Sequence, residues 1–155
     1  MPGIFGLIIT DPRIENGQSL FSTMEKVLLH KPWYVSESYL AEDVFLGSIS
    51  IRSPYKIETI TLHGNEYTIL IDGHVYSVND DDQNRETMTS WTIPERIVRL
   101  YVSQGRSGLQ KVAGNYSIAI YKKQKTNSSF SMTLLAREDS IMVIFQECWS
   151  SRLRS

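Results

Sequence analysis

The chain has 155 residues, and its 16 Lys and Arg nearly balance its 17 Asp and Glu. The length fits one domain with a core of its own, and the balanced charge argues against a general nucleic-acid binder. A single cysteine, Cys148, excludes an internal disulfide and favours a reducing compartment. No stretch approaches the roughly 20 apolar residues of a membrane span. We therefore expect a soluble cytoplasmic domain without a membrane or nucleic-acid partner.

The first predicted element is a strand over residues 4–9, a continuous apolar run typical of strands that are buried on both faces. A helix is predicted next, over residues 20–28, because apolar side chains recur there at helical spacing. These side chains are Leu20, Phe21, Met24, Val27 and Leu28. Ser19 is the expected N-cap of this helix.

Alternating apolar and polar residues predict the next two strands, over residues 44–51 and 57–62. A turn at 63–65 then leads into an apolar run over 67–71. The turn chemistry of these residues predicts a hairpin between the second of these strands and this run.

Asp72 and Gly73 are expected to break the strand that precedes them, and a separate strand follows over residues 74–78. The polar stretch 79–90 predicts a surface loop. The hairpin and the strand that follows it therefore favour an antiparallel sheet in this part of the chain.

A second helix is predicted over residues 93–104, with Pro94 in its first turn and Gly105 as its C-cap. Residues 116–121 and 130–136 flank a polar loop and predict a second hairpin. Strands outnumber helices, and hairpins link most of them. The prediction is one α+β domain over residues 1–155, with antiparallel sheets and at least two covering helices. A last apolar run, 141–145, is expected to pair beside the second hairpin.

Five segments, in chain order, resemble the glutaminase domain of class II glutamine amidotransferases, especially the asparagine synthetase branch. They are Met-Pro-Gly-Ile-Phe-Gly at 1–6, Asp-Gly-His-Val-Tyr-Ser at 72–77, Glu-Arg-Ile-Val-Arg-Leu-Tyr at 95–101 with Gly105, Val-Ala-Gly-Asn-Tyr-Ser-Ile-Ala-Ile-Tyr at 112–121, and Leu-Ala-Arg-Glu at 135–138. The resemblance implies a four-layer αββα sandwich of the Ntn type, here with its C-terminal part cut short.

The family's catalytic position is altered in this chain. In the family, an N-terminal Cys follows Met and attacks the glutamine amide, with its own α-amino group as general base. The matching residue here is Pro2, which has no side-chain nucleophile. The secondary amine of Pro2, exposed if Met1 is removed, is a further candidate base, although no partner residues accompany it. We expect no glutaminase activity.

Three of the other positions that the resemblance assigns are altered as well, and Gly73 is kept. An Asn and the following Gly N–H form the family's oxyanion hole, and Asp72 and Gly73 occupy those positions here. The family holds the substrate carboxylate with an Arg, where this chain has Ser48, and the substrate amine with an Asp, where it has Ile93. An ionised Asp offers no donor, and a hydroxyl does not replace a guanidinium.

The resemblance therefore implies a degenerate glutaminase-like domain that serves an ATP-dependent, amide-forming synthetase, such as a β-lactam-forming or lasso-peptide-cyclising enzyme. On this interpretation the chain is the N-terminal part of a longer synthetase. The chain itself needs no cofactor, whereas a downstream synthetase domain would use ATP and Mg²⁺. Two alternatives stay open. One is a stand-alone interaction protein that binds another protein or a peptide, and the other is a glutaminase inactivated by a Cys-to-Pro change. Scattered histidines and the lack of ligand spacing argue against a metal site.

Overall fold

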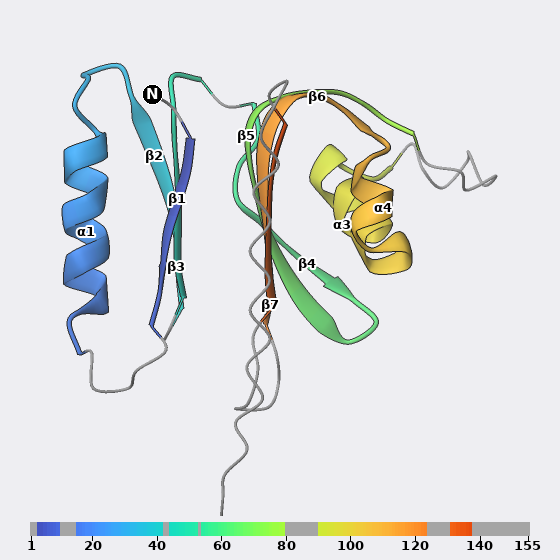
Figure 1. The fold of residues 1–155 in the computed structure, drawn as a ribbon, viewed down its shortest axis with the longest axis horizontal. Coiled ribbons are helices and arrows are strands. Elements are labelled where there is room, and N and C mark those ends of the chain that lie inside the picture. The colour runs from blue at the N-terminus through green and yellow to red at the C-terminus, as the bar shows by residue number, and fades with distance from the viewer. Residues whose placement is uncertain are drawn as a thin grey trace, which may run out of the picture.

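The computed structural model describes residues 3–9, 15–41, 44–52, 54–79 and 90–123, together with the backbone of 131–137. The strands are β1 (Gly3–Ile8), β2 (Val35–Leu40), β3 (Val44–Ser50), β4 (Glu58–Leu62), β5 (Asn65–Val78), β6 (Val112–Lys123) and β7 (Ser131–Arg137), and the helices are α1 (Gly17–Leu28), α3 (Ile93–Gln104) and α4 (Arg106–Leu109). They form two antiparallel sheets with helices packed against them (Figure 1). The predicted α+β class is confirmed.

Sheet A has the strand order β1–β3–β2, and sheet B has the order β4–β5–β6–β7. All neighbouring strands in both sheets are antiparallel. Both predicted hairpins are present, as β4–β5 and β6–β7. The strand β2 and the short helix α4 were not predicted from the sequence.

Helix α1 packs on sheet A through one buried aromatic residue. The ring of Phe21 stacks on Phe5 of β1, with 5.0 Å between centroids, and lies 5.9 Å from the ring of Phe45 on β3. The predicted N-cap is wrong, because the helix begins at Gly17 and Ser19 already lies inside it. Gly17 is buried, and a side chain there would collide with Ile9. The helix therefore starts earlier than its apolar periodicity indicates.

The two sheets pack against each other through a small apolar cluster. Its buried members are Val44, Leu46, Leu70, Ala119 and Tyr121, and partly buried side chains around them are Ile4, Tyr39, Ala41 and Ile57. They come from β1, β2 and β3 of sheet A and from β5 and β6 of sheet B, except Ala41, which follows β2, and Ile57, which precedes β4. This contact covers one face of sheet A, and α1 covers the other.

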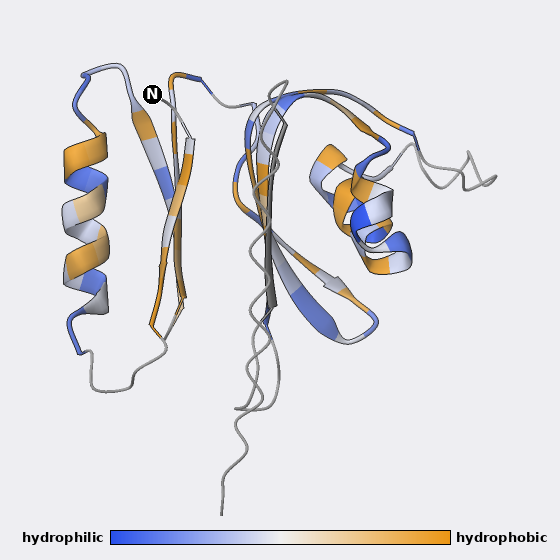
Figure 2. Ribbon diagram, viewed as in Figure 1, coloured by the Kyte–Doolittle hydropathy of each residue, from blue (hydrophilic) through white to orange (hydrophobic). Residues whose placement is uncertain are grey.

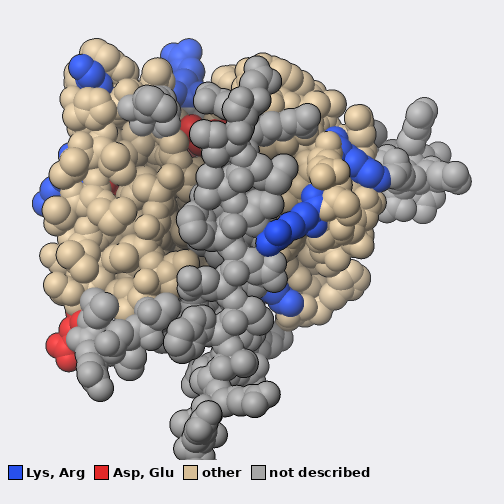
Figure 3. All heavy atoms as spheres, viewed as in Figure 1, with Lys and Arg blue, Asp and Glu red and all other residues tan. Residues whose placement is uncertain are grey.

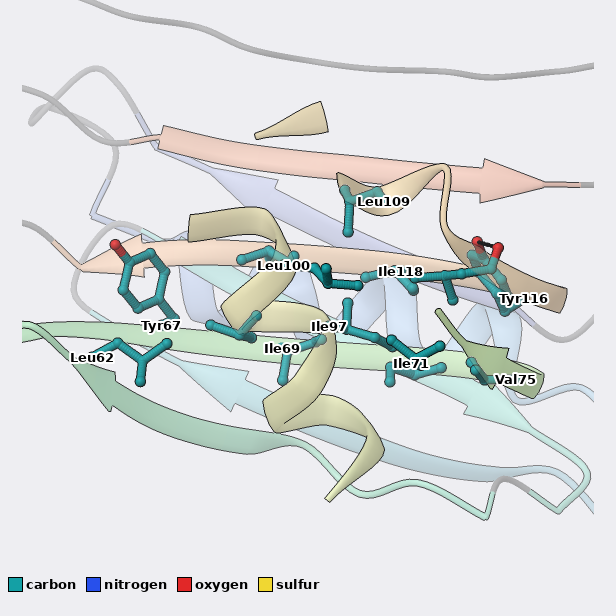
Figure 4. Close-up of a cluster of buried hydrophobic side chains, with 14 residues drawn as sticks. Leu62, Tyr67, Ile69, Ile71, Val75, Ile97, Leu100, Leu109, Tyr116 and Ile118 are labelled. Atoms are coloured by element: carbon teal, nitrogen blue, oxygen red, sulfur yellow. Dashed lines mark hydrogen bonds between the residues drawn. The ribbon is translucent and has the colours of Figure 1, made fainter. Parts of the chain in front are cut away.

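A larger core lies between sheet B and the helices α3 and α4 (Figure 4). Ile69, Ile71 and Ile118 project from the sheet toward Ile97 and Leu100 of α3, and all five side chains are buried. The predicted second helix is confirmed at its C-terminus, where Gly105 adopts a left-handed φ of 62°. Thr92 caps its other end by accepting a hydrogen bond from the Glu95 N–H at 3.3 Å.

Three sequence expectations about strands are corrected. The strand β5 runs without interruption through Asp72 and Gly73, because a left-handed Gly is accommodated inside the ladder. All seven residues of β3 are buried rather than alternating, because α1 and sheet B cover its two faces. The strand β1 is only partly buried, because no described strand borders its outer edge.

Several expectations fall on residues outside the described ranges. The predicted strand over 141–145 lies there, and so does most of the predicted loop over 79–90. Among the described helices, none combines the length and the hydropathy that a membrane span requires.

Candidate functional site

Ser48 lies in the middle strand of sheet A and faces sheet B. Its partners in the sheet are Ile4 on β1 and Glu37 on β2. Side chains two residues apart on a strand share a face, and Leu46 belongs to the cluster between the sheets. Ser48 therefore points into the same inter-sheet layer, and it is 8% exposed. A neutral hydroxyl occupies the position at which the family resemblance expects a guanidinium.

Asp72 lies on the opposing sheet and faces sheet A. Leu70, two residues earlier on β5, belongs to the inter-sheet cluster, so Asp72 projects toward the same layer. Its partner across the β5–β6 ladder is Ser117. Figure 1 shows the N-terminal end of β1 and the C-terminal ends of β3 and β5 at the same edge of the molecule. Both side chains, Ser48 from sheet A and Asp72 from sheet B, thus face the layer between the two sheets.

Gly73 and Gly114 let the two longest strands approach each other closely beside Asp72. Gly73 has φ 99°, and a Cβ there would collide with the carbonyl oxygen of Asn115. Gly114 has φ 155°, and a Cβ there would collide with the carbonyl oxygen of His74. The ladder also shifts register between Val75 and Ser77. Irregularities of this kind concentrate next to functional sites.

The environment of Asp72 raises the pKa of its carboxyl group. Burial is the largest cause, and it disfavours the charged form. A hydrogen bond from the backbone N–H of Gly73 and the nearby His74 act in the opposite direction. Compared with an exposed aspartate, the Asp72 carboxyl group therefore holds its proton to a higher pH.

Glu37 is a further polar residue of this layer, and the sequence did not single it out. It pairs with Ser48 in the sheet, and its Oε2 accepts a hydrogen bond from the backbone N–H of Ile57 at 3.0 Å. The sequence signal that could have identified Glu37 is the alternating segment Ser-Glu-Ser-Tyr that ends at Tyr39. This segment is too short to predict the strand β2, so the sequence alone did not place the Glu37 side chain.

Ile93 does not lie with these residues. It is the first residue of α3, and its side chain packs against the core between sheet B and the helices. That core lies on the opposite face of sheet B from Asp72. The structure therefore directs Ser48 and Asp72 toward the same inter-sheet layer and places Ile93 elsewhere, and Pro2 lies outside the described residues.

The histidines do not supplement this site. His74 is exposed, His63 occupies the β4–β5 turn, and the His30 ring packs edge-on against Tyr34 after α1. Among the described residues, no group of three or more His, Cys, Asp or Glu side chains is placed to hold a metal ion.

Comparison with protein-family models, curated proteins and solved structures finds no match. The family resemblance therefore rests on the quoted sequence segments.

Proposed function

We propose that the chain is a non-catalytic, glutaminase-like domain that supports an ATP-dependent, amide-forming enzyme of the asparagine synthetase type. The proposal includes a four-layer αββα arrangement, in the order α1, sheet A, sheet B, and α3 with α4. The contacts of Phe21 with sheet A, of the two sheets with each other, and of α3 with sheet B are compatible with this order.

The observation that carries the proposal is the partly buried carboxyl group of Asp72, which faces the inter-sheet layer directly before Gly73. Gly73 keeps the left-handed backbone that a close approach of β5 to β6 requires. The side chain before it supplies an acceptor where an oxyanion hole needs a donor. Gly73 thus has the backbone conformation that the fold needs, whereas Asp72 does not supply the donor that the reaction needs. This combination supports a domain that kept the family's fold and lost its catalytic activity.

The residues opposite Asp72 support the same conclusion. Ser48 is neutral and Glu37 is acidic, so neither of these two paired residues presents a cation to a substrate carboxylate. A bidentate Arg is the side chain best suited to hold that group. Free glutamine would therefore meet acceptors and hydroxyls rather than a carboxylate clamp.

Release of ammonia from glutamine tests the loss of catalysis. The assay compares the chain as it stands, a Pro2→Cys variant that restores a thiol, and a Pro2→Ala variant as a control without a nucleophile. We expect none of the three to release ammonia above the background without protein. Ammonia release by Pro2→Cys alone would mean that Ser48 and Asp72 still permit binding, and it would favour the alternative of a recently inactivated glutaminase.

The supporting role is tested separately, by the reading frame of the gene. An in-frame continuation that encodes a Ser-Gly-Gly-x-Asp-Ser pyrophosphate loop is the expected result. A stop codon directly after Ser155 would instead favour a stand-alone interaction protein with the same fold.

A further inference from the structure

The outer edge of β1 is the least protected strand edge among the described residues. Its sequence, Gly-Ile-Phe-Gly-Leu-Ile, contains no charged or polar side chain. The opposite edge of sheet A, β2, carries Glu37 between two serines, and the described edge β4 of sheet B begins with Glu58. Proteins normally protect exposed edges with charges, prolines or bulges. An apolar edge without them indicates a surface that is covered in the functional state.

Helix α1 extends this apolar edge. At about 100° per residue, Leu20, Met24 and Val27 lie about 60–120° to one side of Phe21, which points at the sheet. Val27 is 69% exposed and Leu20 is 44% exposed. The other flank is polar and carries Gln18, Ser22 and Glu25. The helix therefore has one apolar flank, made of Leu20, Met24 and Val27, that does not reach the described core.

The topology places this apolar flank beyond β1. Both β1 and β2 are antiparallel to β3, so they run parallel to each other and α1 connects them. Crossovers between parallel strands of one sheet are right-handed in almost all proteins. With that handedness, the polar flank of α1 faces β2 and the apolar flank faces the free edge of β1.

The figures agree with this placement. Figure 1 draws β1 in front of β3, and Figure 2 shows hydrophobic residues on the turns of α1 that face the viewer. Figure 3 shows that the surface over α1 and sheet A on this side is nearly free of charged residues. The β1 edge and the apolar flank thus form one continuous uncharged surface.

We propose that this surface binds a second copy of the chain, with β1 pairing antiparallel to β1 of that copy. An isologous contact requires a surface that is complementary to itself, and an uncharged strand with an apolar helix flank meets this requirement. Two copies of sheet A then become one continuous sheet. The backbone N–H and C=O groups on the edge of β1 that no described strand borders then gain partners across the twofold axis.

The distances support a second copy rather than an isolated strand as the occupant. Strands lie about 4.8 Å apart in a sheet, so the twofold axis would lie about 2.4 Å outside β1. Phe21 contacts both Phe5 and Phe45, which places α1 over the boundary between β1 and β3. The two α1 axes would then be about 10 Å apart, which is a normal separation for packed helices. A single added strand would leave the apolar flank of α1 without a helical neighbour.

Sedimentation equilibrium of the full chain tests this proposal, with two charge-matched variants. Leu20→Lys/Val27→Lys places two cations on the apolar flank, and Gln18→Lys/Thr23→Lys places two on exposed positions elsewhere on α1. We expect a dimer for the natural chain and for the second variant. For the first variant we expect a dimerisation constant weakened by about tenfold or more. Circular dichroism and thermal unfolding check that each variant is folded, and Val27→Lys alone replaces the double variant if the latter does not fold.

Two results would overturn the proposal. One is a monomeric natural chain, including the case in which hydrogen exchange shows that the β1 amides are protected by another segment or partner. The other is a dimer that Leu20→Lys/Val27→Lys and Val27→Lys do not weaken, since its interface would lie elsewhere. This test does not depend on the proposed function, because it measures association and not glutamine chemistry.

Discussion

The Oε2 atom of Glu37 accepts a hydrogen bond from the backbone N–H of Ile57 at 3.0 Å, and this bond joins β2 of sheet A to the segment that enters β4 of sheet B. Both residues lie beside the apolar cluster that holds the sheets together, since Tyr39 and Ile57 pack against it. The bond therefore connects the two sheets at a point where a backbone donor would otherwise lose its partner.

Glu37→Ala should lower the free energy of unfolding by about 1–2 kcal/mol, because it leaves the partly buried N–H of Ile57 without this acceptor. Glu37→Gln keeps a side-chain oxygen of the same reach, so it should cost clearly less. Urea unfolding, monitored by tryptophan fluorescence, measures both changes. Equal losses in the two variants would show that charge, and not the hydrogen bond, is the stabilising feature.

Gly73→Ala should be strongly destabilising. The substitution introduces a side chain at φ 99°, and its Cβ would collide with the carbonyl oxygen of Asn115. Gly64→Ala is the matched control, because Gly64 also has a positive φ, of 75°, but has open space around it. We expect about 1–2 kcal/mol for Gly64→Ala from backbone strain alone, and a larger loss, of about 3 kcal/mol or more, for Gly73→Ala.

Thermal unfolding of these two glycine variants separates two causes of lost stability. One is the backbone strain that both variants share, and the other is the collision with β6 that only Gly73→Ala introduces. A Gly73→Ala loss no larger than that of Gly64→Ala would mean that β5 and β6 separate easily at this point. The interpretation of Gly73 as a residue required by strand approach would then fail.

Asp72→Asn should make the protein more stable at neutral pH and leave it unchanged at low pH. Burial raises the pKa of Asp72 above its ordinary value of 3.8, so the folded state holds this proton at a pH at which the unfolded state has released it. Stability then falls as the pH rises from 3.8 through the raised pKa, because ionisation is easier in the unfolded chain. Asn cannot ionise, so the variant avoids this loss.

Melting temperatures of the natural chain and of Asp72→Asn, measured from pH 3 to pH 8, check this prediction. The two curves should coincide below the ordinary Asp pKa of 3.8 and separate above it, with the variant higher. A difference that is constant across the pH range would show that ionisation of Asp72 is not the cause.

The elements that could be predicted from the sequence are those with a long periodic pattern or a clear turn. The helix predicted over 93–104 agrees with α3 of the structure, because its apolar side chains recur every three to four residues and Gly105 ends it. The β4–β5 hairpin matched because residues 63–65 have turn chemistry. These signals are local, so they do not depend on the rest of the fold.

The misplaced elements depend on tertiary contacts that no local pattern contains. β3 is buried on both sides because α1 and sheet B meet there, although its sequence alternates. Glycine is a residue type typical of strand ends, so the sequence predicts a break at Gly73. In the structure Gly73 lies inside β5, where β6 approaches it closely. For the same reason, only the packing of the sheets shows that Ser48 and Asp72 face the interface and that Ile93 lies away from it.

Phe21→Ala should detach α1 from sheet A. The Phe21 ring is 3% exposed and lies against the rings of Phe5 and Phe45, so its removal leaves a cavity between helix and sheet. Such truncations cost about 3–5 kcal/mol. Phe21→Leu keeps most of the apolar volume and should cost clearly less. Hydrogen exchange should show faster exchange of the α1 amides in Phe21→Ala than in Phe21→Leu, while the α3 amides respond equally in both. Faster exchange of α3 in Phe21→Ala would mean that α1 and the core under α3 unfold as one unit, and that this ring supports more than its own helix.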